Sequence, residues 1–386
     1  MAKKDDILKA SENLFAESGY EAVTLRQIST LAGVPLSLVH YYFSSKQSLY
    51  EEVLKRYSNE INSDRIARLS ALQSLPKMDT HKLLSKCVEA YVEAYTERRI
   101  ESGSEAWCNY SHMVAEISLS PKWLSQSLQY LGPSETALFQ SICKVFPESD
   151  EVELYWACFF VSGITALAFA ETGRIDKFSN NKCNSTDLKT NIKYMIPFLV
   201  AGIQELAEKP IRELPLYKVP PIEVTKATDT KNIILDAAEN VFAQYGYYAS
   251  TMRKIMKTAN TNLSLAYYHF KTKNDIFIAV HARRAKQSEA LRLQMFEELQ
   301  DKDPFDEDYL EHVIRAYIEV PFSYTVNSGE NWRNYIQLLA ITAHTPLWNV
   351  AASCYNTVVN NLTKALGRRS ATTDDSYMWC CLYVMG

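Results

Sequence analysis

Glycine and strand patterns are scarce in this chain. Only 11 of its 386 residues are glycine, and no stretch alternates apolar and polar side chains over the length of a β-strand. Amphipathic stretches with a helical period recur instead. The sequence therefore predicts an all-α fold, and its length predicts two or more domains.

Targeting segments and catalytic motifs are also missing. Residues 1–6 are mostly charged, and no uninterrupted run of 18 apolar residues follows, which predicts a cytoplasmic protein. The eight cysteines lack the spacing of a disulfide framework or a zinc site. No nucleophile elbow, phosphate loop, metal set or carboxylate pair stands out, so we expect neither an enzyme nor a cofactor.

The pattern that is present is an internal repeat. Leu8–Arg56 aligns without gaps on Leu235–Arg283, at an offset of 227 positions, with 21 identical residues of 49. Further matches follow at slightly smaller offsets, among them Trp107 with Trp332. The chain is therefore one unit present in two copies.

The repeat divides the chain into five predicted segments. Residues 1–57 and 231–286 are the closely matching parts, each followed by a longer helical segment, 58–208 and 287–386, of which the second is the shorter. Residues 209–230 contain four prolines, which predicts an extended, semi-rigid linker.

Each copy carries the local signals of a helix-turn-helix. In the first copy, Gly19 is expected to end a helix. Thr24 and Gln27 form a capping box that begins a short second helix, and Gly33 permits a left-handed turn after it. The second copy has Asn260 at this turn, and asparagine is the non-glycine residue that best tolerates the conformation.

The third helix of each copy is predicted to enter the major groove of DNA. In the first copy it begins at Pro35, with Val39 facing inward and Phe43 in the core. A fourth helix then begins at Ser44 or Ser45. The residues expected to contact bases or phosphates are Thr24, Arg26, Leu36, Ser37, Leu38, His40, Tyr41 and Lys46 in the first copy, and Thr251, Arg253, Asn262, Leu263, Ser264, Tyr267, Tyr268 and Lys273 in the second.

These segments resemble the DNA-binding domain of the TetR family of regulators. Thr24–Lys46 reads T-L-R-Q-I, then A-G-V, then H-Y-Y-F-S-S-K, and Thr251–Lys273 reads T-M-R-K-I, then Y-Y-H-F-K-T-K. The resemblance implies two helix-turn-helix heads, each followed by a helical ligand-binding and dimerisation domain. It also implies operator DNA as the partner, and repression that is relieved by an effector.

The family normally binds a palindrome as a homodimer, so the resemblance implies that one chain supplies both heads as an intramolecular pseudo-dimer. We expect an imperfect palindrome, because the two recognition helices differ in sequence. A dimer of tandem chains is the alternative. Lys226–Lys286 holds ten basic and four acidic residues, whereas Met1–Tyr57 holds seven of each. We therefore expect the second head to contribute more of the salt-dependent affinity.

An effector site is predicted from aromatic pairs that recur in the helical segments. Residues three apart share a helix face, and apolar pockets with a few polar groups are typical of ligand sites. The candidates are Trp107, Tyr110, His112, Trp332 and Tyr335, which indicate a small apolar or aromatic effector. Such pairs are also typical of a packed core or a dimer interface, and control by a partner protein without any effector is the alternative function.

Overall fold

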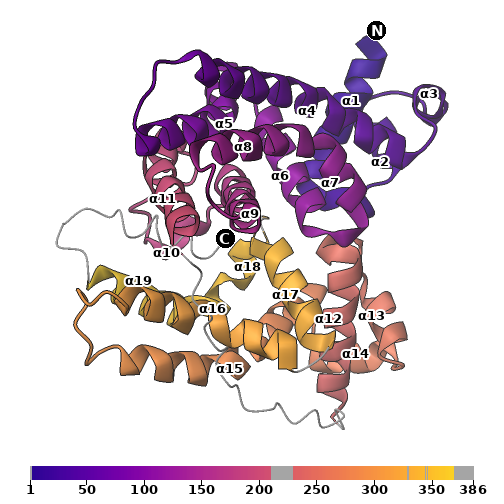
Figure 1. Ribbon diagram of the computed structural model, residues 1–386. Coiled ribbons are helices and arrows are strands. Elements are labelled where there is room, and N and C mark those ends of the chain that lie inside the picture. The colour runs from indigo at the N-terminus through magenta and orange to yellow at the C-terminus, as the bar shows by residue number, and fades with distance from the viewer. Residues whose placement is uncertain (1, 210–228, 328–329, 344, 346, 369–386) are drawn as a thin grey trace. The chain divides into compact units, whose positions relative to one another are not determined.

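The computed structural model describes residues 2–209, 229–327, 330–343, 345 and 347–368. All elements within these ranges are helices, which confirms the predicted all-α fold (Figure 1). Contacts divide the chain into two compact units, Met1–Glu171 with Ser185–Arg212, and Thr172–Asn184 with Glu213–Met385. Most of the predicted linker, and the end of the second copy beyond Arg368, lie outside the described residues.

The helices of the first unit are α1 (Ala2–Ala22), α2 (Leu25–Leu31), α3 (Leu36–Tyr42), α4 (Lys46–Ala71), α5 (Thr80–Ser102), α6 (Ala106–Leu119), α7 (Leu124–Tyr130), α8 (Gly132–Val145), α9 (Glu151–Phe169) and α11 (Leu188–Glu208), with short 3₁₀ turns η1 (Leu72–Ser74) and η2 (Pro121–Trp123). Those of the second unit are α10 (Arg174–Phe178), α12 (Thr230–Ala249), α13 (Met252–Thr258), α14 (Leu263–His269), α15 (Lys273–Glu298), α16 (Tyr309–Asn327), α17 (Glu330–Ala343), α18 (Trp348–Ala351) and α19 (Asn356–Gly367), with η3 (Ala352–Tyr355).

Local sequence accounts for the ends of the head helices. The capping box at Thr24 is present with both of its hydrogen bonds. Gly33 and Asn260 both adopt the left-handed backbone, with φ of 64° and 50°, as predicted. Gly19 also has a positive φ, of 74°, and its non-helical backbone ends the first helical stretch of α1, as predicted; a second, short helical stretch follows it and continues to Ala22.

Helix α4 links the head of the first unit to the bundle behind it. It begins at the Ser45 capping box and packs against α1, α5 and α8. The predicted boundary at residue 57 therefore falls inside a continuous helix. Helix α6 packs against α1 on one side and α9 on the other, so the head also rests directly on the bundle.

The second unit repeats this plan. Helix α15 also has 26 residues and runs through the predicted boundary at residue 286. Helix α12 packs against α13, α15 and α17. One apolar core joins Phe242 and Ile255 of the head to Leu338 and Trp348 of the bundle. In each unit the recognition helix is therefore mounted on a scaffold whose core continues into the bundle.

Helix α9 has an unusual composition. Within the described ranges it alone is long and apolar enough to cross a membrane, although the sequence has no uninterrupted apolar run of that length. Half of its apolar window is buried inside the fold, and a core helix of a soluble protein meets the same criteria. Its other face exposes Val152, Tyr155, Trp156, Phe159 and Phe160.

Candidate functional site

The outer face of α3 is the candidate DNA-reading surface of the first head. Val39 is fully buried and Phe43 is 5% exposed, so these two side chains hold α3 against α1 and α2. Figure 1 shows α3 on the outside of the head, beyond α2. The predicted contact residues on α3 are exposed, except for the half-buried Leu38: Leu36, Ser37, His40 and Tyr41.

Helix α14 presents the same kind of surface in the second head. The Asn262 side chain begins the helix by accepting a hydrogen bond from the backbone nitrogen of Leu265 at 2.9 Å, and Ala266 is fully buried beneath it. Ser264, Tyr267 and Tyr268 are exposed, and Leu263 is half-buried.

One exposed tyrosine occupies the same place in both heads. Tyr41 is 79% exposed and Tyr268 is 82% exposed, and each lies near the end of its recognition helix. An aromatic side chain kept so far out of the core contributes little to folding. A tyrosine hydroxyl is able to hydrogen-bond a phosphate oxygen, and contact of Tyr41 and Tyr268 with DNA stays a prediction.

The threonines and arginines at the start of the second helix lie beside this surface. Thr24 and Thr251 cap α2 and α13 by accepting from the backbone nitrogens of Gln27 and Lys254, at 3.3 and 3.2 Å. Arg26 and Arg253 are exposed. The capping role of the threonines is thus visible, and contact of these four residues with DNA stays a prediction.

Lys46 and Lys273 lie at the start of α4 and α15, where they tie these helices to the preceding turn. The ammonium group of Lys46 donates to the backbone oxygens of Tyr20 and Val23, at 2.7 and 2.9 Å. Lys273 donates in the same way to Tyr247 and Ser250. Burial lowers the pKa of both ammonium groups. Phosphate contact stays a prediction for both lysines, and it would compete with these bonds.

Between Thr24 and Lys46 the two heads differ in formal charge at three matching positions. The second head has Lys254, Lys257 and Lys271 where the first has Gln27, Thr30 and Ser44. Lys257 and Lys271 are exposed and Lys254 is half-buried. Lys254 and Lys257 lie on α13 and Lys271 follows α14, so these three positive charges lie on or next to the helix-turn-helix of the second head.

A cavity of about 50 Å³ lies inside the bundle of the first unit. Its lining residues come from α4, α5, α6, α8 and α9 and from the turn before α8: Ile61, Arg65, Tyr91, Tyr95, Tyr110, Ser111, Val114, Ser118, Leu131, Glu135, Ser162, Thr165, Ala166 and Phe169. Most of the lining is apolar or aromatic, with a few hydroxyls and two charged groups, as in small-molecule sites.

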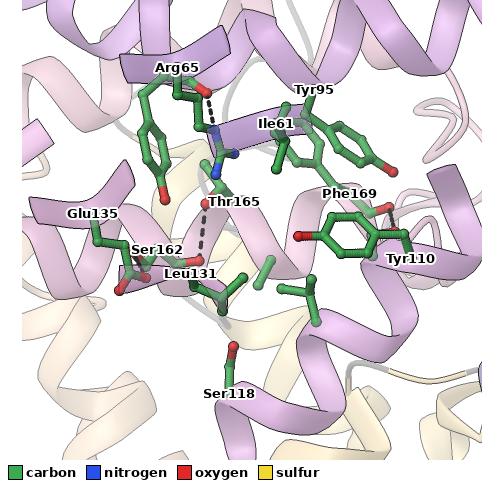
Figure 2. Close-up of a pocket in the computed structure, with 14 residues that line it drawn as sticks. Ile61, Arg65, Tyr95, Tyr110, Ser118, Leu131, Glu135, Ser162, Thr165 and Phe169 are labelled. Atoms are coloured by element: carbon green, nitrogen blue, oxygen red, sulfur yellow. Dashed lines mark hydrogen bonds between the residues drawn. The ribbon is translucent and has the colours of Figure 1, made fainter. Parts of the chain in front are cut away.

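The two charged groups of the cavity lie apart. Figure 2 shows the Arg65 guanidinium pointing into the middle of the pocket, with Glu135 and Ser162 grouped on one side and Tyr110 and Phe169 on the other. Ser162 donates its hydroxyl to Glu135 at 2.8 Å. Arg65 is 8% exposed, and its Nε donates to the backbone oxygen of Tyr91 at 2.9 Å.

The residues predicted for the effector site are all in packed surroundings. Of the first-unit candidates only Tyr110 lines the cavity. Trp107 is 6% exposed and packs edge-on against Tyr110. His112 lies against the backbone oxygen of Ala170 at 2.6 Å, and burial lowers the pKa of its imidazole.

The second-unit candidates lie deep in its core. Trp332 is 1% exposed and stacks on Tyr324. The Tyr335 hydroxyl lies 2.6 Å from that of Tyr355. An effector role for these two residues stays a prediction.

A half-buried glutamate joins the bundle to the first head. Glu116 of α6 accepts hydrogen bonds from the backbone nitrogen of Tyr20, at 2.9 Å, and from the Tyr50 hydroxyl, at 3.0 Å. Burial raises the pKa of this carboxyl group to about 7. The second unit has Phe277 and Ile341 at the matching positions, so this polar contact belongs to the first unit.

Arg65, Glu135 and Glu116 are residues of the candidate sites that were not predicted from the sequence. A signal for Arg65 exists, because Tyr57, Ile61, Arg65 and Leu69 follow one another at intervals of four residues. A lone arginine in an otherwise apolar stripe of a helix is a candidate for a buried charge with a specific partner. No comparable pattern marks the two glutamates.

The fold and the two exposed recognition helices define a helical protein with two helix-turn-helix heads. Two family models match the chain. The model of bacterial regulatory proteins of the TetR family matches residues 7–53 and again 234–280, and that of the tetracyclin repressor-like C-terminal domain matches residues 89–202. The chain belongs to the TetR family of regulators, which are not enzymes, and it carries two of the family's DNA-binding heads.

Curated relatives match a smaller part of the chain. It is 44% identical over 55 residues to the HTH-type transcriptional regulator RutR of Escherichia coli, and 32% identical over 89 residues to the HTH-type transcriptional repressor NicS of Pseudomonas putida. These segments cover 14% and 23% of the chain, and 26% and 42% of the relatives. The chain therefore matches less than half of the length of these relatives.

Proposed function

We propose that this chain is a cytoplasmic, ligand-responsive transcription repressor whose two heads bind the two halves of an imperfect palindromic operator. The observation that carries the proposal is the duplicated head. Val39 and Ala266 are both fully buried beneath recognition helices whose outer faces are exposed. Two such heads on one chain supply what a palindrome requires, and the different side chains at His40 and Tyr267 favour unequal half-sites.

Ligand response is proposed from the position of α6. Ser111 and Val114 of this helix line the cavity, while Glu116 accepts hydrogen bonds from Tyr20 and Tyr50 of the head and of α4. A ligand that displaces α6 would disturb the contact that positions α1. Such a ligand shifts DNA affinity only by as much as it prefers one of the two arrangements.

Sedimentation of the purified chain with a DNA fragment from upstream of its own gene tests the operator proposal. We expect one chain per site, because one chain holds two heads. Two chains per site would contradict the pseudo-dimer. Absence of binding that is stronger than to unrelated DNA of equal length would contradict the operator function.

The exposed aromatic face of α9 favours a second candidate, in which two tandem chains associate. Tyr155, Trp156 and Phe159 are each more than half exposed, and contiguous apolar surface of this kind marks association sites. Sedimentation without DNA separates the two candidates. A concentration-dependent doubling of mass that Trp156→Glu with Phe159→Glu abolishes would favour the dimer of tandem chains.

A further inference from the structure

We infer that the cavity of the first unit binds a short-chain monocarboxylate, whose anionic end pairs with Arg65 and whose other end donates a hydrogen bond to Glu135. This inference rests on the proposed ligand response and specifies the chemical class of the ligand. It replaces the apolar or aromatic effector that the sequence alone predicts.

The Arg65 guanidinium is largely buried and has few hydrogen-bond partners in the protein. The side chain is 8% exposed, its Nε is occupied by the backbone oxygen of Tyr91, and it stacks on the Tyr91 ring, 3.8 Å from the centroid. Among the described residues the bond to the Tyr91 oxygen is the guanidinium's one hydrogen bond. Its two terminal nitrogens are not among the fully buried atoms that lack a partner, so they keep some access to the cavity, where water or an anion can accept hydrogen bonds from them. An anion would in addition offset the charge of this largely buried side chain.

The matching arginine of the second unit shows which contact of Arg65 belongs to the repeated fold. Arg292 holds the matching place in α15 and stacks on Tyr317, 5.2 Å from the ring centroid. The arginine–tyrosine stack is therefore part of the repeated helical packing. In the first unit the guanidinium in addition lines an open volume, into which it points (Figure 2). The planar fork of arginine matches the two oxygens of a carboxylate.

The charged groups of the cavity lining limit the charge of the ligand. Arg65 is the one cation in the lining, and Glu135 is the one anion. A phosphate would bring up to two negative charges beside Glu135 with a single cation to offset them. A monocarboxylate adds one negative charge at most, and a zwitterion such as L-alanine adds none. Either can donate an O–H or N–H to Glu135, which has oxygen lone pairs beyond the one that Ser162 occupies.

Cavity size limits the rest of the ligand. At about 50 Å³ the cavity is roughly a third of the ~150 Å³ cavity that accommodates benzene in an engineered protein. At this size the cavity holds only a few non-hydrogen atoms, so a carboxylate of about four to six such atoms would bind only if the cavity walls move apart. Leu131 and Phe169 would contact its carbon atoms, so lactate and L-alanine are suitable probes.

The test measures ligand-induced thermal stabilisation of the full-length chain. At 10 mM, lactate and L-alanine are expected to raise the Tm by about 2–4 °C, and propionate by less because it lacks the donor. Propionamide, potassium chloride and inorganic phosphate should leave the Tm unchanged at equal ionic strength. Stabilisation by propionamide or phosphate to the same extent, or by none of the carboxylates, would overturn the inference.

Variants then locate the site. Arg65→Gln is expected to weaken lactate binding about 10- to 100-fold in calorimetry. Arg68→Gln is the matched control, because Arg68 lies on the same helix but pairs with Asp64 and Glu97 outside the cavity, and it should bind lactate as the wild type does. Unchanged binding by Arg65→Gln would overturn the inference.

A second variant, Glu135→Gln, tests the same site in case Arg65→Gln does not fold. Glu135→Gln should strengthen propionate binding, because it removes the negative charge beside the carboxylate. Lactate should gain less, because its donor loses the stronger carboxylate acceptor. Equal changes for both acids would overturn the assignment of Glu135.

DNA binding separates this inference from the proposed function. If neutral compounds weaken operator binding and carboxylates do not, the ligand-responsive repressor stands and the carboxylate class is wrong. If the chain binds its operator and compounds of neither class alter that binding, the ligand response itself is wrong.

Discussion

Gly33 and Asn260 place the same left-handed turn in the two heads by different means. Glycine adopts a φ of 64° without cost. Asparagine adopts 50° at a smaller cost than other residues with a Cβ atom. We expect Asn260→Ala to lower the free energy of unfolding by about 1 kcal/mol, as measured by urea unfolding. Asn260→Gly should not lower it, and a stable Asn260→Ala chain would contradict the argument.

Glu116 makes stability depend on pH. Its folded pKa of about 7 lies above the ordinary value of 4.5, so the folded chain binds more protons than the unfolded chain between these pH values. The stabilisation by the neutral carboxyl is complete below about pH 4.5 and is lost as pH rises through 7, by on the order of 3 kcal/mol. Urea unfolding across this range should reveal the slope.

Glu116→Gln should remove this contribution to the pH dependence, because the amide does not titrate. Glu17→Gln is the control, since Glu17 lies on the exposed side of α1 and its loss should leave the slope as in the wild type. An unchanged slope in Glu116→Gln would show that other groups govern the pH response.

Residue-scale predictions from sequence succeeded where the signal was local. The left-handed turns and the inward positions of Val39 and Phe43 follow from backbone preference and helix period, which a single sequence contains. Arg65 and Glu135 could not be paired from sequence, because they lie on α4 and α8, and only tertiary packing brings them to one cavity. The Glu116 contact has the same origin, 96 positions from Tyr20.

At the scale of elements, three lysines on or next to the helix-turn-helix are expected to strengthen DNA binding by the second head. Replacing Lys254, Lys257 and Lys271 by the first head's Gln, Thr and Ser removes three positive charges beside the DNA surface. The slope of log affinity against log salt should fall by up to about 3, since each phosphate contact contributes about 0.9. Binding to the upstream fragment from 50 to 200 mM salt measures it. A slope equal to that of the wild type would show that these lysines do not contact DNA.

The ends of α4 and α15 do not coincide with the end of the sequence similarity between the two copies. The close match between the copies fades after Arg56, which suggested a boundary near residue 57. Helix α4 continues to Ala71 and α15 to Glu298. Similarity declines there because the bundle tolerates varied side chains at a constant helical period, so a change in sequence need not mark a structural boundary.

At the scale of the whole molecule, the two heads should contribute unequally to DNA affinity. A carboxylate on the recognition helix repels phosphates and the acceptor-rich base edges. We expect Ser37→Glu and Ser264→Glu each to weaken operator binding, and the second change to do so more because it disables the more basic head. Fluorescence anisotropy on the same DNA fragment compares them. A larger loss from Ser37→Glu would reverse the predicted order.

Phe277 and Ile341 stand in the second unit where Tyr50 and Glu116 meet in the first. A ligand that acted through the polar contact would therefore loosen one head and leave the other in place. The loosened head would stay tethered near its half-site, at a raised effective concentration set by its connection to the bound head. Rebinding of the loosened head to its half-site would then be intramolecular and fast. The chain would therefore dissociate from the operator one head at a time, and the released head could rebind without a new encounter in solution.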